Sequence, residues 1–365
     1  MLTFSPTEEQ EEIRQLAASI AREQLRQAAR SAEKAGDIPT SLLHTITQTG
    51  LTTPFPEVYG GSGQVEAVLY ALIAEELGYG DGGLALNLFG SMMAPLTVAL
   101  AGNESQRQQY LPMFNDEQQG DKQPGCFAFA ERTGGYSFED IQATLRLQGD
   151  SYVLNGTKRD VLHGKQASLR VVLCRLERTT GSEGLCAVLL PENAPGLRVS
   201  EDEQKLGLLA APSASYSFEN VSIPASALLG TPGCQGVICA ASFYLLLRAG
   251  VACGMTRAAL EYARDYARER IAFGRPIASY QGIAFIVAEM AMRLDGVRLL
   301  LWDAALHWDH GVDTDVLVQQ AEAAQYQALI LAKSATIDAI QVLGGAGYLQ
   351  DHPVEMWARN AAAMD

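Results

Sequence analysis

The hydrophobic period of the chain changes twice, and this change constrains the fold more than any other feature of the sequence. In residues 1–122 apolar side chains recur at the spacing of amphipathic helices. Residues 123–228 contain short apolar or alternating runs without helical patterns between them, which predicts strands in a small barrel or sandwich. Residues 229–365 contain long, Ala-rich amphipathic stretches separated by short turns, which predicts an antiparallel helical bundle.

Local signals mark the elements within these regions. Gly149 and Asp150 stand between two short runs and predict a hairpin turn. Ser5, Pro6 and Glu8 fit an N-cap, a proline at the first helical position and a capping-box partner, so they predict the start of the first helix. The predicted strands cover residues 126–130, 141–147, 151–154, 169–176, 185–190 and 215–221, and the long C-terminal helices cover 258–270, 282–310 and 313–343.

Composition narrows the classes of function. Of the 365 residues, 48% are hydrophobic and 19% are charged, which excludes a disordered chain. The formal net charge is −15. Nucleic acid and anionic membrane surfaces both require a basic footprint, so we expect neither as a main partner. A local basic pocket for a phosphorylated ligand remains compatible with this charge.

We expect no membrane span and a cytoplasmic location. The apolar run from Val237 to Leu247 ends at Arg248 and is shorter than the ~20 residues that cross a bilayer. The N-terminus has neither the basic nor the apolar region of a signal peptide. The six cysteines form no CxxC pair, and most lie in apolar or small-residue runs, which is typical of reduced thiols in an intracellular protein.

Two further patterns are better explained by ordinary structure than by ligand binding. Gly78, Gly80 and Gly83 match the spacing GxGxxG, but they follow a helical run rather than a strand, so they predict a glycine-rich helix end. His307 and His310 lie on a polar helix end with no further ligand nearby in the sequence, which predicts solvated histidines and no metal site.

One constellation does point to a ligand. In the segment ERIAFGRPIASYQ, Glu269 to Gln281, a long helix ends near Arg270 and another begins near Gln281. An arginine at such a break can contact a phosphate, Phe273 can pack on a planar ring, and Gln281 can donate hydrogen bonds. A second segment, QVLGGAGY from Gln341 to Tyr348, contains glycines that allow close approach of the backbone to a flat ligand.

Together with the block YGGSG at 59–63, these segments resemble the acyl-CoA dehydrogenase family, and the resemblance covers almost the whole chain. It implies a mostly α, α+β fold with an N-terminal α-helical domain (1–122), a central β-barrel domain (123–228) and a C-terminal four-helix bundle (229–365). In that family the two motifs contact the pyrophosphate and adenosine half of the FAD of a neighbouring subunit, within a tetramer. The resemblance assigns this cofactor-binding role to Arg270, Phe273, Gln281, Gln341, Gly344 and Gly345.

The family's reaction is the α,β-dehydrogenation of an acyl thioester, in which a glutamate removes the α-proton while the β-hydride moves to the flavin. By resemblance, the chain is an oxidoreductase and flavoprotein of fatty acid metabolism that acts on an acyl-CoA or an acyl-carrier thioester. Its acidic balance disfavours docking of an acidic carrier protein.

Two segments depart from the family pattern. The stretch corresponding to T-E-P-G-A-G-S-D reads AERTGGYS in residues 130–137, so Ala130 and Tyr136 replace hydroxyls that bind the flavin edge, while Glu131 is the ordinary family residue. The family's W-x-T-N-G segment reads DVLHG in 160–164, where Asp160 replaces the tryptophan and Leu162 the threonine. A carboxylate in place of an aromatic face disfavours a reduced, anionic flavin.

The resemblance also gives two positions for the catalytic glutamate. Counted from Tyr348 and from Pro353-Val354-Glu355, the usual position falls just beyond Asp365. A minority of the family places it before the arginine of the first bundle helix, which here corresponds to Leu247, before Arg248. The catalytic residue is therefore left unassigned, and Arg248 is the candidate substrate-binding residue.

Three functions stay open. The chain is an acyl-CoA dehydrogenase-type flavoprotein, or it is the non-catalytic subunit of a hetero-oligomeric dehydrogenase that completes a partner's FAD site in trans. The third alternative is the same fold used for binding or for flavin-dependent oxygenation. These alternatives imply a homotetramer or a heterotetramer with a paralogue, and FAD that is bound by the chain itself or shared with the partner.

Overall fold

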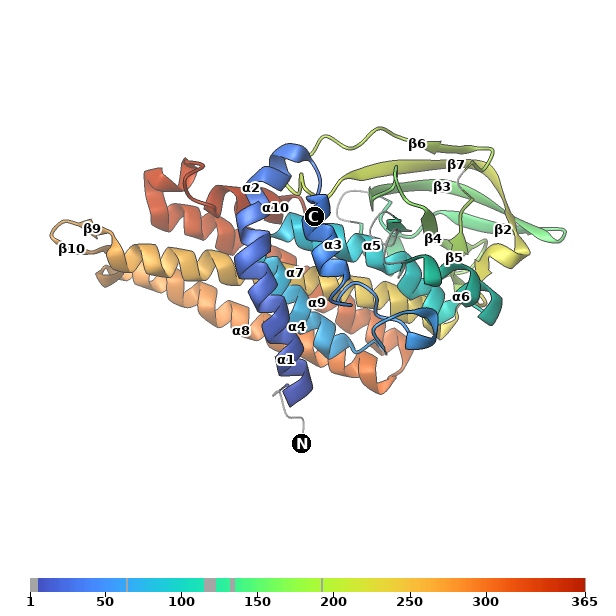
Figure 1. Cartoon of the computed structure of the whole chain (residues 1–365), viewed down its shortest axis with the longest axis horizontal. Coiled ribbons are helices and arrows are strands. Elements are labelled where there is room, and N and C mark those ends of the chain that lie inside the picture. Colours follow the sequence, from blue (N-terminus) through green and yellow to red (C-terminus); the bar gives the residue numbers. More distant parts are fainter. Residues whose placement is uncertain (1–5, 64, 115–122, 132–134, 192, 365) are drawn as a thin grey trace.

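The computed structural model describes residues 6–63, 65–114, 123–131, 135–191 and 193–364. A helical N-terminal region, a central sheet and a C-terminal helical bundle follow one another, so the predicted order of elements is confirmed (Figure 1). The N-terminal helices are α1 (Glu8–Ile20), α2 (Arg26–Ala35), α3 (Thr40–Thr47), α4 (Ala67–Gly80), α5 (Gly82–Ala101) and α6 (Glu104–Tyr110), and a π-helical turn, Ala21–Leu25, joins α1 to α2.

The first helix is capped by other residues than the sequence predicted. The Thr7 hydroxyl accepts a hydrogen bond from the Gln10 backbone N–H at 3.2 Å, and Gln10 Oε1 accepts one from the Thr7 N–H at 3.0 Å. The choice of Glu8 as capping-box partner was therefore wrong, because Thr7 and Gln10 make the same reciprocal bonds. The predicted N-cap, Ser5, lies outside the described residues.

The central β domain is confirmed as one eight-stranded sheet in the order β6-β7-β3-β2-β4-β5-β8, with β1 paired in parallel to β4. The pairing starts at β6 and ends at β8, so within the described part of the chain the sheet is open and hydrogen bonds do not close it into the predicted barrel. In the β2–β3 hairpin Gln148 pairs with Ser151, as the Gly149-Asp150 turn predicted. The strands are β1 (Gly125–Ala128), β2 (Thr144–Gln148), β3 (Ser151–Leu162), β4 (Leu169–Leu176), β5 (Leu185–Leu189), β6 (Leu197–Val199), β7 (Ser213–Pro224) and β8 (Leu228–Leu229).

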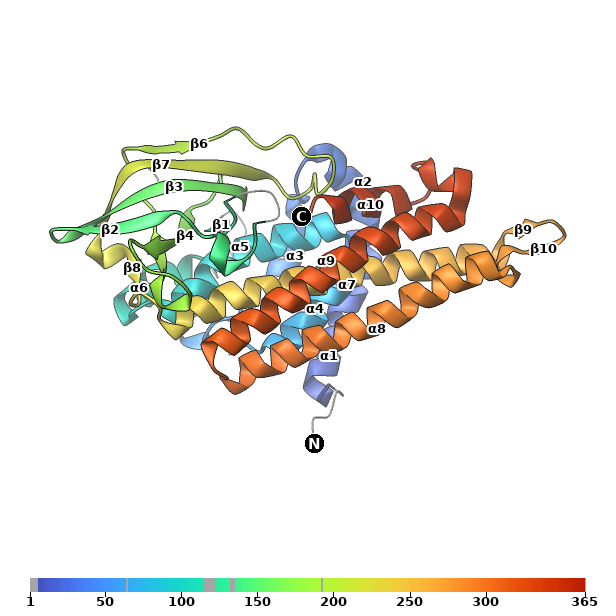
Figure 2. The same cartoon turned by 180° about the vertical axis from the view of Figure 1, so that it is seen from behind.

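Four helices form the C-terminal bundle, and α7 is its central member (Figure 2). They are α7 (Gln235–Glu269), α8 (Gln281–His310), α9 (Thr314–Leu343) and the shorter α10 (Val354–Ala362). α7 packs against α8 and α9 and also against α4 and α5 of the N-terminal region. Nearly all side chains of its first six turns are buried, so the two helical regions share one core.

Three helices among the described residues are long and apolar enough to cross a membrane by length and composition alone: Gly82–Ala101, Gln235–Glu269 and Thr314–Tyr348. The fold buries 83%, 89% and 50% of their apolar windows, respectively. The apolar run does end at Arg248, but the helix does not: α7 continues to Glu269 and the arginine is buried within it. The run was therefore too short a measure of this apolar helix. That the chain has no membrane span stays a prediction.

A buried ion network joins α4 to three other helices. Glu75 and Glu76 are adjacent on α4, and both are buried. Arg298 of α8 donates to both Glu75 oxygens at 2.6 to 3.1 Å, while Arg257 of α7 and Arg14 of α1 donate to Glu76 at 2.6 to 3.1 Å. Burial would raise the pKa of Glu76, but the two arginines more than offset it, so the pKa is lowered. Loss of one partner would leave a buried charge unpaired, which makes the network sensitive to helix displacement.

Glycines set the distance between α4 and α7. A methyl carbon on Gly78 would lie 2.5 Å from the Val251 carbonyl oxygen, and one on Gly254 would lie 2.2 Å from the Glu75 carbonyl oxygen. α4 ends at Gly80, and the next residue caps α5 through its carboxylate. The GxGxxG spacing is therefore a helix end with close packing, as predicted, and not a dinucleotide-binding loop.

We expect Gly254→Ala to destabilise the chain, because the added methyl group would force α4 and α7 apart. Overpacking of this kind costs ~1–3 kcal/mol, so the midpoint of urea unfolding should fall. The matched control is Gly296→Ala within α8, where the added carbon would have no heavy atom of the described residues within 4 Å apart from its own helix backbone and chain neighbours. It should raise the free energy of unfolding by up to about 1 kcal/mol through helix propensity. Equal responses of the two variants would contradict the close contact between the helices.

Candidate functional site

A short hairpin joins α7 to α8 and contains most of the first motif. Arg270 leaves α7 in an extended conformation, with φ −71° and ψ 117°. β9 (Ile271–Ala272) then pairs with β10 (Arg275–Pro276) around the turn Phe273-Gly274. Both turn residues have positive φ, 51° and 83°, as tight two-residue hairpins require. The hairpin therefore holds Phe273 at its tip.

The hairpin presents an aromatic and cationic surface. The Phe273 side chain is 96% exposed, and its ring lies edge-on to Tyr280 with the centroids 6.5 Å apart. The Arg275 guanidinium lies 4.2 Å from the Tyr280 ring centroid, and Arg270 is exposed. A bulky residue with positive φ is strained by ~1–2 kcal/mol, and this strain is not offset by burial of the ring. Strain of this kind is typical of a binding surface.

The second motif forms the end of α9. Gln341 is exposed on the last turn, and Gly344 ends the helix with a φ of 60°. Apart from the adjoining residues of the chain, no heavy atom of the described residues lies within 4 Å of the point where a side chain on Gly344 or Gly345 would begin. The backbone is therefore open to close approach by another molecule. Gln281, from the first motif, is the exposed first residue of α8.

Both motifs lie at the end of the bundle that points away from the central sheet (Figures 1 and 2). The structure thus brings the six predicted cofactor-binding residues to one end of the molecule. We call the six residues Arg270, Phe273, Gln281, Gln341, Gly344 and Gly345 the exposed edge. The exposed edge is separated from the described parts of the two departing segments, residues 130–131, 135–137 and 160–164, which belong to the sheet region (Figure 2).

A cluster of rings and charges fills the junction between the central sheet and α7. The Arg248 side chain is 1% exposed, and its guanidinium carbon lies 3.6 Å from the ring centroid of Tyr136. Tyr136, 4% exposed, stacks on Phe129 with the centroids 5.7 Å apart. Its hydroxyl donates a hydrogen bond to Asp160 Oδ2 at 2.5 Å. We call Tyr136, Asp160 and Arg248 the Tyr136 cluster.

Burial keeps the Tyr136 phenol of this cluster neutral. Burial raises the pKa of Tyr136 well above its ordinary value, although the charge of Arg248 acts in the opposite direction, so the phenol keeps its proton. Arg248 stays protonated; its Nη2 donates to the Met364 carbonyl oxygen, and its Nε has no hydrogen-bond partner among the described residues. Lys205, whose pKa burial lowers, adds a second cation near Asp160.

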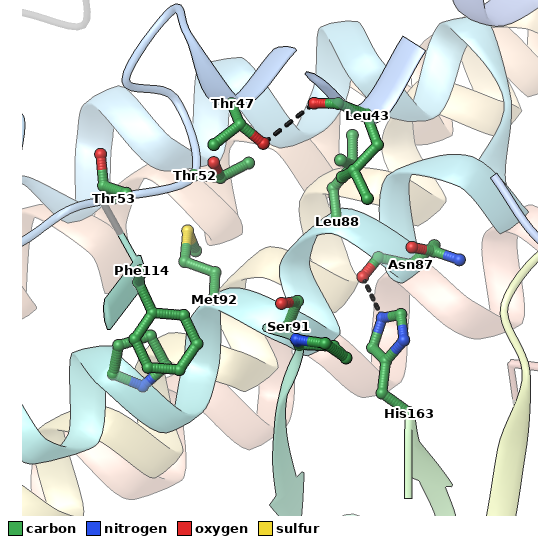
Figure 3. Close-up of a pocket in the computed structure, with 12 residues that line it drawn as sticks. Leu43, Thr47, Thr52, Thr53, Asn87, Leu88, Ser91, Met92, Phe114 and His163 are labelled. Atoms are coloured by element: carbon green, nitrogen blue, oxygen red, sulfur yellow. Dashed lines mark hydrogen bonds between the residues drawn. The ribbon is translucent and has the colours of Figure 1, made fainter. Parts of the chain in front are cut away.

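The end of β3 is fixed to α5. Asp160 and His163 both have positive φ, 51° and 56°. Between them, Leu162 packs on α5 so closely that a methyl carbon on Gly90 would lie 2.7 Å from Leu162 Cβ. His163 Nε2 lies 2.8 Å from the Asn87 carbonyl oxygen (Figure 3). Two contacts with α5 therefore hold the segment that carries Asp160.

A cavity of about 40 Å³ lies beside this contact (Figure 3). It has room for water and not for a cofactor ring. The Thr52 hydroxyl oxygen is buried without a protein partner, so water is its natural partner here. The lining residues are Leu43, Thr47, Thr52, Thr53, Asn87, Leu88, Ser91, Met92, Pro95, Phe114, Pro124 and His163.

Glu131 is fully engaged in the structure. Its carboxylate accepts hydrogen bonds from Lys158 Nζ at 2.8 Å and from the backbone N–H groups of Gln142 and Ala143 at 2.8 and 2.9 Å. Lys158 also donates to the Phe129 carbonyl oxygen at 2.8 Å. The pair therefore holds the loop before β2 against β3.

The other residues considered from the sequence, Leu247 and the pair His307 and His310, do not form a second catalytic or metal site in the described part of the chain. Leu247, the alternative position of the catalytic glutamate, is an apolar residue buried in α7. His307 Nδ1 lies 3.6 Å from Asp303, and His310 Nδ1 lies 2.7 Å from the Leu306 carbonyl oxygen. No group of three or more His, Cys, Asp or Glu side chains is placed to hold a metal ion in the part of the chain that the structure describes.

Three family models match the chain: acyl-CoA dehydrogenase N-terminal domain over residues 7–118, middle domain over 126–221 and C-terminal domain over 238–365. The chain belongs to the acyl-CoA dehydrogenase family. An acyl-CoA dehydrogenase of Bacillus subtilis is 33% identical to it over 97% of this chain and 93% of that protein. The mitochondrial short-chain specific acyl-CoA dehydrogenase of Rattus norvegicus is 33% identical, over 96% and 84%. The butyryl-CoA dehydrogenase of Megasphaera elsdenii superposes with a TM-score of 0.84 at 26% identity, over 100% and 95% of the two chains.

Acyl-CoA dehydrogenases use FAD, and the residues of this chain fit only one half of that molecule. The exposed edge offers an aromatic ring, cations and open backbone, which suit an adenosine and a pyrophosphate. At the buried centre, the Tyr136 ring contacts both Phe129 and the Arg248 guanidinium directly. The Tyr136 ring therefore fills the space between Phe129 and Arg248, and Asp160 adds a carboxylate, so the buried centre does not fit the flavin ring as far as the structure describes it.

The sequence did not predict the aromatic partners of Arg248. Tyr244 precedes Arg248 by four residues, so both lie on one face of α7, and the guanidinium carbon is 5.8 Å from the Tyr244 ring centroid. Phe127 and Phe129 alternate along β1 and its extension, and both pack near Tyr244. The spacings of Tyr244 with Arg248 and of Phe127 with Phe129 were the signals in the sequence that could have indicated this aromatic cluster. The other residues of the 130–137 stretch that the family motif covers, Arg132, Thr133 and Gly134, lie outside the described residues.

We expect Phe273→Asn to unfold at a higher urea concentration than Phe273→Ala. Both variants lose the exposed ring, but asparagine adopts positive φ more readily than alanine. The difference in free energy of unfolding should be up to about 1 kcal/mol. Equal midpoints would mean that the turn of the hairpin does not impose positive φ on this residue in solution.

Proposed function

We propose that the chain is a subunit of a flavin-dependent acyl-CoA dehydrogenase, an assembly that introduces an α,β double bond into an acyl thioester with FAD as the hydride acceptor. Membership of the family supports this reaction. The similar proteins include a short-chain specific acyl-CoA dehydrogenase, a butyryl-CoA dehydrogenase and a glutaryl-CoA dehydrogenase, which act on acyl-CoA thioesters. We propose an acyl-CoA rather than an acyl-carrier protein as substrate, because the net charge of −15 opposes docking of an acidic carrier.

The observation that carries the proposal is the place of the exposed edge. It lies at the end of the bundle away from the sheet (Figure 2), so the chain cannot fold it onto its own buried centre. Phe273 is held in a strained, exposed position there, and burial against another molecule would offset that strain. The exposed edge therefore binds the pyrophosphate and adenosine half of an FAD whose ring belongs to a neighbouring subunit.

The assembly is proposed to form through the outer faces of α8 and α9. On α8, Phe285 and Met292 are 66% and 69% exposed, and with Leu299 they repeat every seven residues, on one face. Tyr326 and Ile337 of α9 are also exposed. Exposed apolar side chains that share one face of a helix are typical of protein contacts. We propose a tetramer, and the residues of the buried centre favour a heterotetramer with a paralogue over a homotetramer.

The proposed compartment is the cytoplasm. All six cysteines are free thiols. Burial raises the pKa of Cys174 and of Cys253, so these thiols stay protonated and inert. A protein with six unpaired cysteines suits a reducing compartment.

The test of the proposed function is an affinity purification of the full chain from its native cells. The purified assembly should contain FAD and should reduce an artificial electron acceptor when an acyl-CoA is added. Absence of both flavin and acyl-CoA-dependent reduction from the intact assembly would contradict the proposal.

The exposed edge can be tested in the same assembly. We expect Arg270→Ala with Phe273→Ala to weaken FAD retention by about 10- to 100-fold, since a charge-assisted hydrogen bond and a ring contact together contribute ~1.5–3 kcal/mol. The matched control is Arg146→Ala with Leu147→Ala, which removes an exposed arginine and an exposed apolar residue from the β2 strand instead. Equal FAD content in the two double variants would rule out a role for the hairpin.

We expect Phe285→Glu with Met292→Glu to lower the mass of the assembly measured by light scattering. Each added carboxylate would have to be desolvated in an apolar contact, which costs several kcal/mol per ion. Leu206→Glu, at a residue that is equally exposed but lies outside the bundle, should leave the mass unchanged. An unchanged mass of the double variant would place the contact elsewhere.

A further inference from the structure

The two segments that depart from the family pattern meet in space and bind each other. Residues 130–131 and 135–137 approach the end of β3, where the Ala130 carbonyl oxygen accepts a hydrogen bond from the Arg159 N–H at 2.8 Å. Next to this contact the Tyr136 hydroxyl reaches Asp160. The departures at positions 136 and 160 are therefore one feature rather than two independent changes.

Tyr136 occupies the centre of the junction with its ring. Phe129 stacks on it at 5.7 Å with an interplanar angle of 30°, and the Tyr244 centroid lies 6.1 Å away. Arg248 covers the ring at 3.6 Å. A buried guanidinium needs a counter-charge or a π face, and Tyr136 supplies the π face while Asp160 supplies a carboxylate at the far end of the phenol. The ring thus stabilises the buried charge without help from a ligand.

The backbone on both sides of Asp160 is also fixed. Leu162 is packed against Gly90 of α5, and His163 contacts the Asn87 carbonyl oxygen. Asp160 is held from the other side, since its N–H lies 3.5 Å from Glu203 Oε1, and Glu203 accepts from the Ser213 and Ser215 hydroxyls at 3.1 and 2.6 Å. The backbone that carries the Asp160 carboxylate cannot move away from Tyr136 unless these contacts break.

From these contacts we propose that the Tyr136 ring, held by Asp160 and Arg248, closes the flavin-ring site of this chain, so that the chain binds no flavin ring of its own. This inference rests on the proposed function in one respect, namely that the exposed edge then serves only the FAD of a partner that has an open ring site. Tyr136 is the residue whose side chain determines whether the flavin-ring site is open or filled.

The first test uses the wild-type chain and flavin mononucleotide, which contains the ring but not the adenosine that the exposed edge would bind. We expect that the protein does not quench the fluorescence of flavin mononucleotide, even when the ligand is present at millimolar concentration. Stoichiometric binding of the ring to the wild-type chain would overturn the proposal. This measurement uses the unsubstituted chain, so its result does not depend on whether a variant folds.

The second test compares two triple variants that differ only at position 136. One carries Tyr136→Ser with Asp160→Trp and Leu162→Thr, and the other carries Tyr136→Phe with the same two changes. We expect the serine variant to bind flavin mononucleotide at least 100-fold more tightly, because phenylalanine keeps the ring that fills the site. Circular dichroism and a cooperative unfolding curve establish that both are folded. Equal affinities of the two folded variants would show that Tyr136 does not close the site.

The two proposals fail in different measurements. If the proposed function is wrong, the assembly purified from native cells lacks flavin, whatever position 136 contains. If only the closed site is wrong, the assembly contains flavin and the wild-type chain alone binds flavin mononucleotide. Titration with ADP, which lacks the ring, reports on the exposed edge and should be unaffected by the change at position 136.

Discussion

The buried charge of Arg248 is the constraint on which the junction between the central sheet and the bundle depends. The residue lies within the most buried part of α7, where an isolated guanidinium would be far too costly to keep. The Tyr136 ring covers the guanidinium, Asp160 supplies a carboxylate from β3, and the Met364 carbonyl oxygen accepts one of its hydrogen bonds from the C-terminal side. The charge thus ties the sheet, the bundle and the segment after α10 together. Residues that could face a ligand in an open site, Tyr136, Asp160 and Arg248, instead contact one another in this chain.

The bundle separates the two halves of the site. α7 and α8 are long and packed closely along α4 through glycines and the Glu75–Glu76 ion network, so the hairpin at their far end is carried on a rigid support. Phe273 is positioned there at the cost of backbone strain. Because α7 and α8 hold the hairpin away from the Tyr136 cluster of the same chain, the hairpin is well placed to contact a second subunit. The exposed apolar faces of α8 and α9 lie on the same support.

Much of the fold followed from hydrophobic period and turn chemistry. The order of helical and strand regions, the Gly149-Asp150 hairpin and the long bundle helices were predictable because they depend on local patterns. The short strands β6 and β8 were missed because they have only three and two residues. The full length of α7 was also missed: Arg248 looked like the end of an apolar run, and only tertiary contacts with Tyr136 make an arginine acceptable there.

The candidate site was predictable in part for a related reason. The motifs of the exposed edge are continuous in the sequence, so Arg270 and Phe273 could be found without the structure. The Tyr136 cluster joins residues 24 and 88 positions apart, and no local signal indicates that Tyr136 faces Asp160 and Arg248. The sequence showed that hydroxyl and tryptophan positions had changed, but the structure shows that the replacements are partners of each other.

The stoichiometry of FAD in the native assembly tests the central claim most directly. Native mass spectrometry of the assembly purified from its own cells would count the FAD molecules and identify the chains that surround them. The closed site and the exposed edge together predict one FAD for each pair of unlike chains, with this chain as the member that lacks a flavin ring. An assembly of identical copies of this chain with one FAD on each copy would contradict the account.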